Sequence, residues 1–400
     1  MRTAAESASL ARPVATETAA ATRRLPWLVL GSVRTYPFDP TCVMPNFDAI
    51  RLFATVAIVF LHTAANGVNR LAQGSPDWWL ANLIDSACRA GVPLFLMLSG
   101  ALLLNRSHQS ATQFYHNRLQ KLALPLVLWS LFYLLWSALK AQVKQQPYSL
   151  NTAAEQLLAG APYFHLWFIY MLAGVYLLLP PLRQFWQQLT PAQQTLFCWL
   201  ALMLQQSLHG LYFLLALPEP PWPLWALGYL PYLLLGAWLT RPQQAKPIRS
   251  PLLVFTALLL LIGTSALLYH WQRDAGLSEP FYYSYHRMSL PVLLSALLLW
   301  QLLQPLPPVR SRLLQAIRRH SLGIYCAHPL FLDLTEFGRQ QLAQAGSALP
   351  YAVQLLLQTS VVLGASLGLS LLLQRLRDYW LSAAQPGKGA VKSAIAATLT

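Results

Sequence analysis

The sequence predicts an all-α polytopic membrane protein with about ten transmembrane helices and both termini in the cytoplasm. Three observations point to this class: 56% of the 400 residues are apolar, only 10% are charged, and the apolar residues fall in long runs. Soluble globular domains carry about 25% charged residues. The composition therefore excludes an ordinary cytosolic enzyme, a disulfide scaffold and a disordered chain.

Each predicted membrane helix is a mostly apolar run close to the roughly 20 residues that cross the hydrocarbon core. Such runs are too long for buried strands, which take up about 4–8 residues. Polar and Pro-rich breaks separate them. In chain order the predicted spans are 47–66, 78–104, 119–140, 163–182, 192–216, 223–240, 251–271, 287–304, 318–337 and 351–374.

The distribution of positive charge predicts the orientation, because Lys and Arg accumulate on the cytoplasmic side of membrane spans. With the N-terminus inside, 20 of the 28 basic residues fall in inner segments and 6 in outer segments, while Arg51 and Arg89 fall inside spans. This asymmetry favours an even number of spans. It also accounts for the formal net charge of +15, so nucleic-acid binding is not needed to explain the charge.

The chain divides into a cytoplasmic, flexible N-terminal arm (1–46), a transmembrane domain (47–376) and a cytoplasmic C-terminal tail (377–400). The one short apolar patch in the arm is too brief for the core of a secretory signal.

The cysteines show neither metal-ligand spacing nor a disulfide framework, which predicts buried thiols and no metal cofactor. They are Cys42, Cys88, Cys198 and Cys326.

Ionisable residues inside the first span invite a functional hypothesis, because each costs at least about 2.5–3.5 kcal/mol on insertion scales. Arg51 and His62 are separated by about 16 Å along a helix and lie within about 20° of the same face. We expect Arg51 near the cytoplasmic end and His62 deep toward the outer side. Asp48, one helical turn before Arg51, can pair with it. The alternative reading is an interfacial arginine, a packing histidine and a helix-start carboxylate.

The second span contains another acid–base pair at helical spacing, Asp85 and Arg89. The pair either neutralises itself or serves a ligand. Pro93 predicts a kink. Ser99 is the residue of the following segment for which direct chemistry is considered alongside packing.

Three other spans supply polar candidates. Arg118 and Lys121 can face one anionic group, although positive-inside topology alone also explains them. His165 and Trp167 open the fourth span, where an interfacial aromatic belt is the default account of Trp167. His328 lies inside the ninth span.

Four ordered blocks of the chain resemble the integral-membrane acyltransferases called acyltransferase type 3. The blocks are Asp48-x-x-Arg51 with His62 after ten residues, Arg89-x-x-Val92-Pro93-Leu94-Phe95 with Ser99-Gly100, Phe164-His165-Leu166-Trp167-Phe168, and Arg319-His320-Ser321-Leu322-Gly323-Ile324-Tyr325 with His328. The likeness is closest to the branch that contains the enterobacterial common antigen O-acetyltransferase.

The resemblance implies a multi-pass protein of the bacterial inner membrane that uses acetyl-CoA from the cytoplasm as co-substrate, with no permanently bound cofactor. The implied acceptor is a sugar hydroxyl on a lipid-linked or extracytoplasmic glycan. His62 is the implied catalytic histidine and Arg51 its partner. Many members carry two arginines three residues apart near the third span, linked with the acyl-CoA site. Here the match is Arg118 and Lys121, and lysine lacks the planar fork of arginine.

Acyl transfer from a thioester to a hydroxyl requires removal of a proton and donors for the developing oxyanion. His62 suits either a general base or a transient acyl carrier. Further candidates are Arg89 and Ser99 as oxyanion donors and acyl-CoA contacts, Arg51, Arg118 and Lys121 as partners of the coenzyme A phosphates, and Asp48, Asp85, His165, Trp167, Tyr325 and His328 in supporting roles.

A transporter or flippase for a glycolipid or an acylated substrate is the alternative, because it too needs intramembrane charges and a basic inner face. The sequence does not indicate an oligomeric state.

Overall fold

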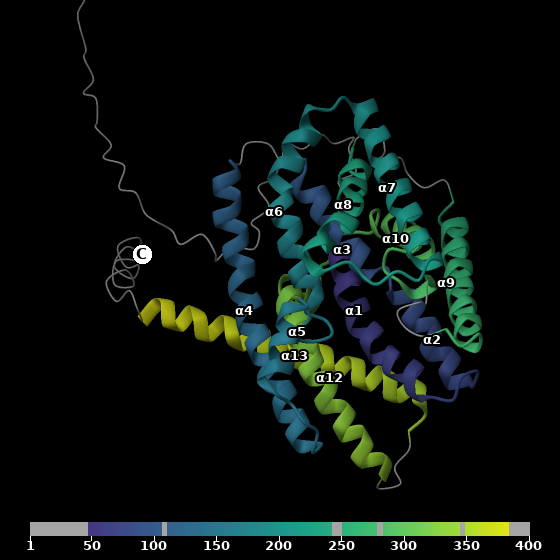
Figure 1. The fold of residues 1–400 in the computed structure, drawn as a ribbon, viewed down its shortest axis with the longest axis vertical. Helices are drawn as coiled ribbons and strands as arrows, with labels where there is room; N and C mark the ends of the chain where they lie inside the picture. Colours follow the sequence, from purple (N-terminus) through teal and green to yellow (C-terminus); the bar gives the residue numbers. More distant parts are fainter. Residues whose placement is uncertain (1–46, 106–109, 242–249, 278–282, 345–348, 384–400) are drawn as a thin grey trace, which may run out of the picture. The chain divides into compact units, whose positions relative to one another are not determined.

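The computed structural model of the chain describes residues 47–105, 110–241, 250–277, 283–344 and 349–383. Within these ranges the protein consists of thirteen α-helices and one short 3-10 helix, with no β-strand (Figure 1). The elements are α1 (Phe47–Arg70), α2 (Pro76–Cys88), α3 (Gly91–Leu103), α4 (Ala111–Val143), α5 (Leu150–Leu158), α6 (Trp167–Gln188), α7 (Pro191–Leu214), α8 (Trp222–Leu239), α9 (Pro251–Asp274), η1 (Tyr283–Tyr285), α10 (Leu290–Leu303), α11 (Arg312–Arg319), α12 (Ser321–Gln344) and α13 (Tyr351–Ala383).

The predicted all-α membrane class is confirmed, because seven helical segments of the described chain are long and apolar enough to cross a bilayer. They are Phe47–Arg70, Pro76–Leu103, Ala111–Val143, Trp167–Gln188, Pro251–Asp274, Tyr283–Leu303 and Tyr351–Trp380. Helices α7, α8 and α12 are not among them. In α7 the glutamines reduce the mean hydropathy, and in α8 the Trp, Tyr and Pro residues do so. In α12 the acidic residues have this effect. The count of ten spans and the location of the termini stay predictions.

Two predicted regions fall partly or wholly outside the described residues. The N-terminal arm (1–46), Cys42 and residues 384–400 of the tail lie there. The described start of the predicted tail is helical, since α13 continues to Ala383.

The outward faces of α4 and α9 are apolar. On α4 the side chains of Leu124, Leu128, Leu131 and Leu135 are each more than half exposed. On α9 the same holds for Leu252, Leu253, Leu260 and Leu267. Apolar surface this continuous is rare on proteins that face water. These faces are suited to lipid, as expected of a multi-pass membrane protein.

Proline positions explain several helix boundaries. Ser75, Thr190 and Ser250 each precede a proline at the first helical position, and each side chain accepts a backbone N–H of the first turn. This is a favourable way to begin a helix, because proline has no N–H that would be left unpaired there. The predicted kink near Pro93 is confirmed: the helix breaks between α2 and α3, at Arg89 and Ala90. Pro93 cannot donate to the carbonyl of Arg89 four residues earlier.

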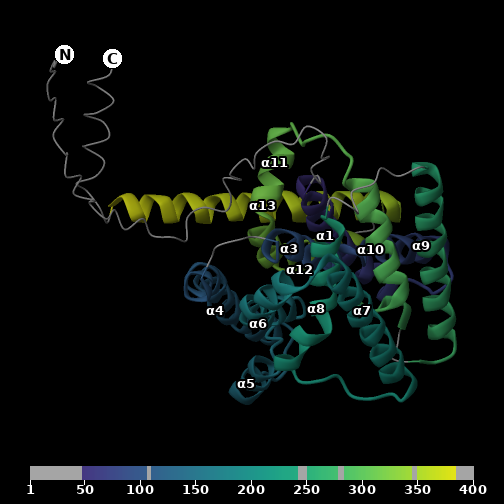
Figure 2. The same cartoon turned by 90° about the horizontal axis from the view of Figure 1, so that it is seen from above.

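Helix α1 occupies the centre of the described helices, in contact with α2, α3, α11, α12 and α13. Figure 2 shows α1 nearly end-on with α13 lying across it. Since α1 is unbroken from Phe47 to Arg70, the predicted spacing of Arg51 and His62 along one face applies. The neighbours of α1 therefore decide what surrounds each of these two side chains.

The closest helix contact is between α3 and α8, where two glycines allow backbone to meet backbone. A Cβ at Gly100 would overlap the carbonyl of Leu233, and a Cβ at Gly236 would overlap the carbonyl of Met97. Close approach of this kind is typical of membrane helices that pack through small residues.

Gly236→Ala is expected to destabilise the protein by about 3 kcal/mol or more, the upper end for overpacking, because backbone must move rather than a side chain. The thermal unfolding midpoint in lipid nanodiscs measures this. Gly263→Ala on α9 is the matched control, since a Cβ there meets nothing within 4 Å. It should be neutral or stabilising by up to about 1 kcal/mol. Equal midpoints for the two variants would contradict the α3–α8 contact.

Candidate active site

The His62 side chain of α1 packs against aromatic rings from two other segments. Its ring stacks on His328 of α12, with the centroids 5.2 Å apart and the planes inclined by 21°. Phe164 meets the same ring edge-on at 5.0 Å. Among the described residues the His62 ring makes no hydrogen bond. The structure thus brings together two histidines that are far apart in the sequence.

The His328 ring is held by an irregular turn of α12. Pro329 has no N–H, so the carbonyl of Tyr325 is free to pair with the Nδ1 of His328, at 2.7 Å. A carbonyl only accepts, so Nδ1 carries the hydrogen and Nε2 has the lone pair. This Nε2 is buried and has no hydrogen-bond partner among the described residues. His328 therefore presents an unprotonated nitrogen in the neighbourhood of His62.

A tyrosine hydroxyl pairs with two further backbone groups of this turn. Tyr133 of α4 donates its hydroxyl to the carbonyl of Cys326 at 2.7 Å. The same hydroxyl accepts the N–H of Leu330 at 3.3 Å. Side chains that enter a helical ladder in this way stabilise kinks. Tyr133 thereby fixes the turn that carries His328.

Tyr133→Phe is expected to reduce stability by about 1–3 kcal/mol, because it leaves a buried carbonyl and a buried N–H without their partner. The unfolding midpoint measures the loss. Tyr148→Phe is the control, since that hydroxyl pairs with Gln156 near the surface. A Tyr133→Phe midpoint no lower than that of Tyr148→Phe would show that the α12 turn does not depend on the hydroxyl.

His165 and Tyr325 complete the group, which we call the histidine cluster: His62, His165, Tyr325 and His328. The His165 ring is buried and lies 5.4 Å from the ring of His328. Tyr325 donates its hydroxyl to the backbone carbonyl of His165. Three predicted supporting residues are therefore assembled around His62.

Two arginines flank the histidine cluster, and their charges act on the His62 ring. Arg89 pairs with the buried Asp85 at 2.8 Å, which confirms the predicted pair. It also donates to the carbonyl of Tyr285 at 2.6 Å. Arg287 lies flat on the ring of Trp167, 3.7 Å from its centre, and was not predicted as a site residue. Arg89 thus belongs to the His62 end of the site.

A second group, the arginine cluster, surrounds the other end of the α1 stripe: Arg51, Arg118 and Arg318. The charges of Arg118 and Arg318 act on Arg51. The pairing predicted for Asp48 is different in the structure, since its carboxylate accepts from Arg318 at 2.7 Å. The reason is that α11 packs beside the start of α1. Among the described residues the Arg51 guanidinium makes no hydrogen bond.

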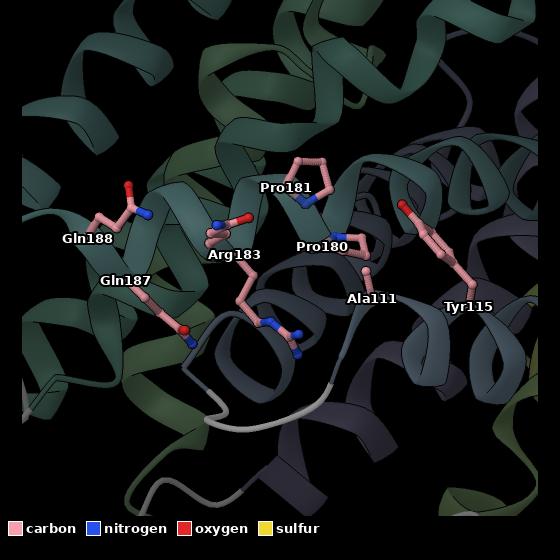
Figure 3. A pocket seen from close by; sticks show the side chains of 8 residues that line it. Ala111, Tyr115, Pro180, Pro181, Arg183, Gln187 and Gln188 are labelled. Carbon is pink, nitrogen blue, oxygen red and sulfur yellow. The ribbon is translucent and has the colours of Figure 1, made fainter.

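Lys121 adjoins this cluster through Arg118, one turn earlier on α4. A pocket of about 570 Å³ lies between the start of α4, the helix that carries Arg118 and Lys121, and the end of α6 (Figure 3). Tyr115 lies at one end of the pocket and Gln188 at the other, with Arg183 between them. Basic and amide side chains around an open pocket suit an anionic, polar ligand.

Ser99, a predicted oxyanion donor and acyl-CoA contact, bonds within its own helix in this structure. Its hydroxyl bonds to the carbonyl of Phe95 at 2.9 Å, one turn back on α3, so its proton is already used. Serine in membrane helices commonly satisfies itself in this way.

A small seam of loose packing lies along α1 between the positions of Arg51 and His62. It is lined by Thr55, Ile58 and Val59 of α1, Phe95 of α3, and Ser321, Ile324 and Tyr325 of α12. Its volume is about 10 Å³, which is close to the space of one water molecule.

In the part of the chain that the structure describes, no group of three His, Cys, Asp or Glu side chains is arranged to hold a metal ion. The described cysteines are free, with Cys198 and Cys326 buried as predicted and Cys88 partly buried.

The fold is that of a multi-pass helical membrane protein, and its polar interior joins a basic cluster to a pair of imidazoles. Residues 44–375 match the family described as an acyltransferase domain, so the chain belongs to the acyltransferase type 3 family and is a membrane acyltransferase. No curated protein and no solved structure matches the chain.

Proposed function

We propose that this protein transfers an acetyl group from cytoplasmic acetyl-CoA to a hydroxyl of a lipid-linked or extracytoplasmic glycan. The observation that carries the proposal is the arrangement along α1: a basic cluster at Arg51, an imidazole pair at His62, and a loosely packed seam between them. An anionic donor and a proton-accepting site at opposite ends of one stripe are what such a transfer requires.

Positive charge at the Arg51 end of the stripe supports the proposed binding of acetyl-CoA there. Arg51, Arg118 and Arg318, with Lys121 beside them, would hold the phosphates of coenzyme A, because arginine forks pair with phosphate oxygens in a bidentate manner. The pocket with Arg183 would take the rest of the nucleotide. The thioester arm of coenzyme A would then reach toward His62, which requires the seam to widen well beyond its present volume of about 10 Å³.

In the proposed reaction His62 accepts the proton of the acceptor hydroxyl while its oxygen attacks the thioester carbonyl. The tetrahedral intermediate collapses with cleavage of the carbon–sulfur bond, and the coenzyme A thiolate takes up the proton from His62. Arg89 and Arg287, whose positive charges act on the His62 ring, would stabilise the oxyanion. A covalent route, in which a His62 nitrogen first carries the acetyl group, uses the same residues.

A glycan acceptor and a place in the bacterial inner membrane are supported by the resemblance to the branch of the enterobacterial common antigen O-acetyltransferase. The predicted orientation places His62 toward the outer side, where such a glycan is reached.

Purified protein in lipid nanodiscs, incubated with acetyl-CoA radiolabelled in the acetyl group and a lipid-linked glycan extract, tests the proposal. Label is expected on the glycan, removable by mild alkali as an ester. Unmodified glycan that crosses a vesicle membrane in the presence of the protein would instead support the flippase alternative. Absence of label on the glycan would overturn the proposed reaction.

A further inference from the structure

Helix α7 carries buried polar atoms that make no hydrogen bond within the part of the chain that the structure describes. Neither amide atom of Gln205 makes a hydrogen bond of good geometry with the described residues, although the amide lies near the Tyr232 hydroxyl, and the side chain is only 6% exposed. The Nε2 of His209, 7% exposed, also makes none, and nor does the hydroxyl of Tyr212. The spacing of four and three residues places all three on one face of the helix. Buried polar groups normally form hydrogen bonds, so we expect a ligand to bind at this face and to pair with them.

The face is completed by residues from two connecting segments. The His286 ring packs against His209, with centroids 4.1 Å apart. Its Nδ1 accepts the N–H of Met288 at 3.2 Å, so Nε2 carries the hydrogen of the neutral ring. That Nε2 lies 3.9 Å from a carboxylate oxygen of Glu219. Tyr283 stacks on His209 at 5.6 Å.

Glu219 brings a negative charge to this group. The contact with His286 lowers the pKa of the Glu219 carboxyl below its ordinary value, and Arg287 acts in the same direction. Glu219 is therefore a carboxylate at neutral pH, a strong acceptor for hydroxyl groups.

Arg287 connects this group to His62. Its Nε donates to the Tyr229 hydroxyl at 2.7 Å, and among the described residues its other guanidinium nitrogens make no hydrogen bond. Its charge acts on both His209 and His62. Arg287 also lies over the ring of Trp167, two residues after His165 of the histidine cluster. A ligand that reaches Arg287 from the α7 face would therefore approach the histidine cluster.

The chemistry of the face selects the ligand class. It offers acceptors, donors and flat aromatic rings, and the charges of Glu219 and Arg287 balance. A hexose ring has hydroxyls that both donate and accept, and apolar C–H faces that pack on aromatic rings. An acyl chain or a free phosphate would leave these groups unpaired or unbalanced.

We infer that Gln205, His209, Glu219, His286 and Arg287 form a binding site for a neutral sugar ring of the acceptor, next to His62. The inference rests on the proposed function, since it identifies the acceptor subsite of that reaction.

The first test separates the KM for acceptor from the KM for donor. Gln205→Leu is expected to raise the apparent KM for the lipid-linked glycan extract about 10-fold, the size of one or two hydrogen bonds, and to leave the KM for acetyl-CoA within about 2-fold. The unfolding midpoint should not fall, because an unpaired amide is replaced by an apolar group of similar size. Gln301→Leu, the same exchange at an exposed position near the end of α10, should change neither KM.

The second test needs no turnover. Diethyl pyrocarbonate labels accessible neutral imidazoles, and mass spectrometry locates the label. The glycan extract is expected to protect His286, while labelling of His270 on α9 stays unchanged. Protection without acetyl transfer would support the sugar site and overturn the proposed reaction. Transfer with an unchanged acceptor KM in Gln205→Leu, or absence of protection at His286, would overturn the sugar site.

Discussion

Replacement of His62 by alanine is expected to lower the rate of acetyl transfer by about 10²–10⁴-fold, the range for loss of a general base. The folded protein should remain, because the lost ring makes stacking contacts with His328 and Phe164 but no hydrogen bond in the described chain. Removal of such a side chain costs about 1–3 kcal/mol. Radiolabel transfer at matched protein levels measures the effect.

His270→Ala is the matched control for His62→Ala. Its imidazole lies near the end of α9 at a partly exposed position, pairs with Asp274 at 3.3 Å and packs against Trp78 and Trp79 rather than against the histidine cluster. This variant should keep wild-type transfer. A His62→Ala protein that retains activity would show that His62 is a packing residue, and the role proposed for the histidine cluster would fail with it.

The second large effect is expected at the donor end. Arg118→Ala should raise the KM for acetyl-CoA by about 5–150-fold, the equivalent of about 1–3 kcal/mol for one charged hydrogen bond to phosphate. The acceptor KM should remain nearly unchanged. The KM of the Arg118→Lys variant for acetyl-CoA should lie between those of the wild type and of Arg118→Ala, because lysine keeps the charge but lacks the planar fork of arginine.

Arg312→Ala controls for the loss of one positive charge near the same end, since Arg312 begins α11 at an exposed position. Both KM values should be unaffected there. If Arg118→Ala raised the acceptor KM and left acetyl-CoA use alone, the donor and acceptor ends of the α1 stripe would have to be exchanged.

Much of the fold could be predicted from the sequence because apolar runs of membrane length are a strong signal. The run 78–104 shows the limit: it is one apolar window, yet Pro93 divides it into α2 and α3. The run 318–337 likewise contains a break, at His320 between α11 and α12. A hydropathy average over a whole window does not detect such a break, because the average is taken over the residues on both sides of it. The break is visible in the backbone hydrogen bonds of the structure. The ten predicted spans exceed the seven apolar segments because α7, α8 and α12, which correspond to three of the predicted spans, are not among those seven.

The site was predictable where chemistry follows helical spacing and not where it depends on tertiary contacts. Arg51 and His62 are on one helix, so their common face could be derived. The partner of Asp48 could not, because Arg318 comes from a helix far along the chain. Arg287 counts among the outer-segment charges in the sequence, since no spacing rule connects it with His62. Gln205 and His209 carried a usable signal: uncharged polar residues one turn apart in an apolar run.

The turn at Pro329 has a consequence for how the protein can change over generations. Proline has no acid–base chemistry, yet it decides which nitrogen of the His328 imidazole bears the hydrogen, because it leaves the Tyr325 carbonyl open to Nδ1. Any other residue at 329 would bring an N–H that competes for that carbonyl. A substitution at this position would change no ionisable group, but it would release the imidazole to the opposite tautomer and remove the lone pair now directed from Nε2.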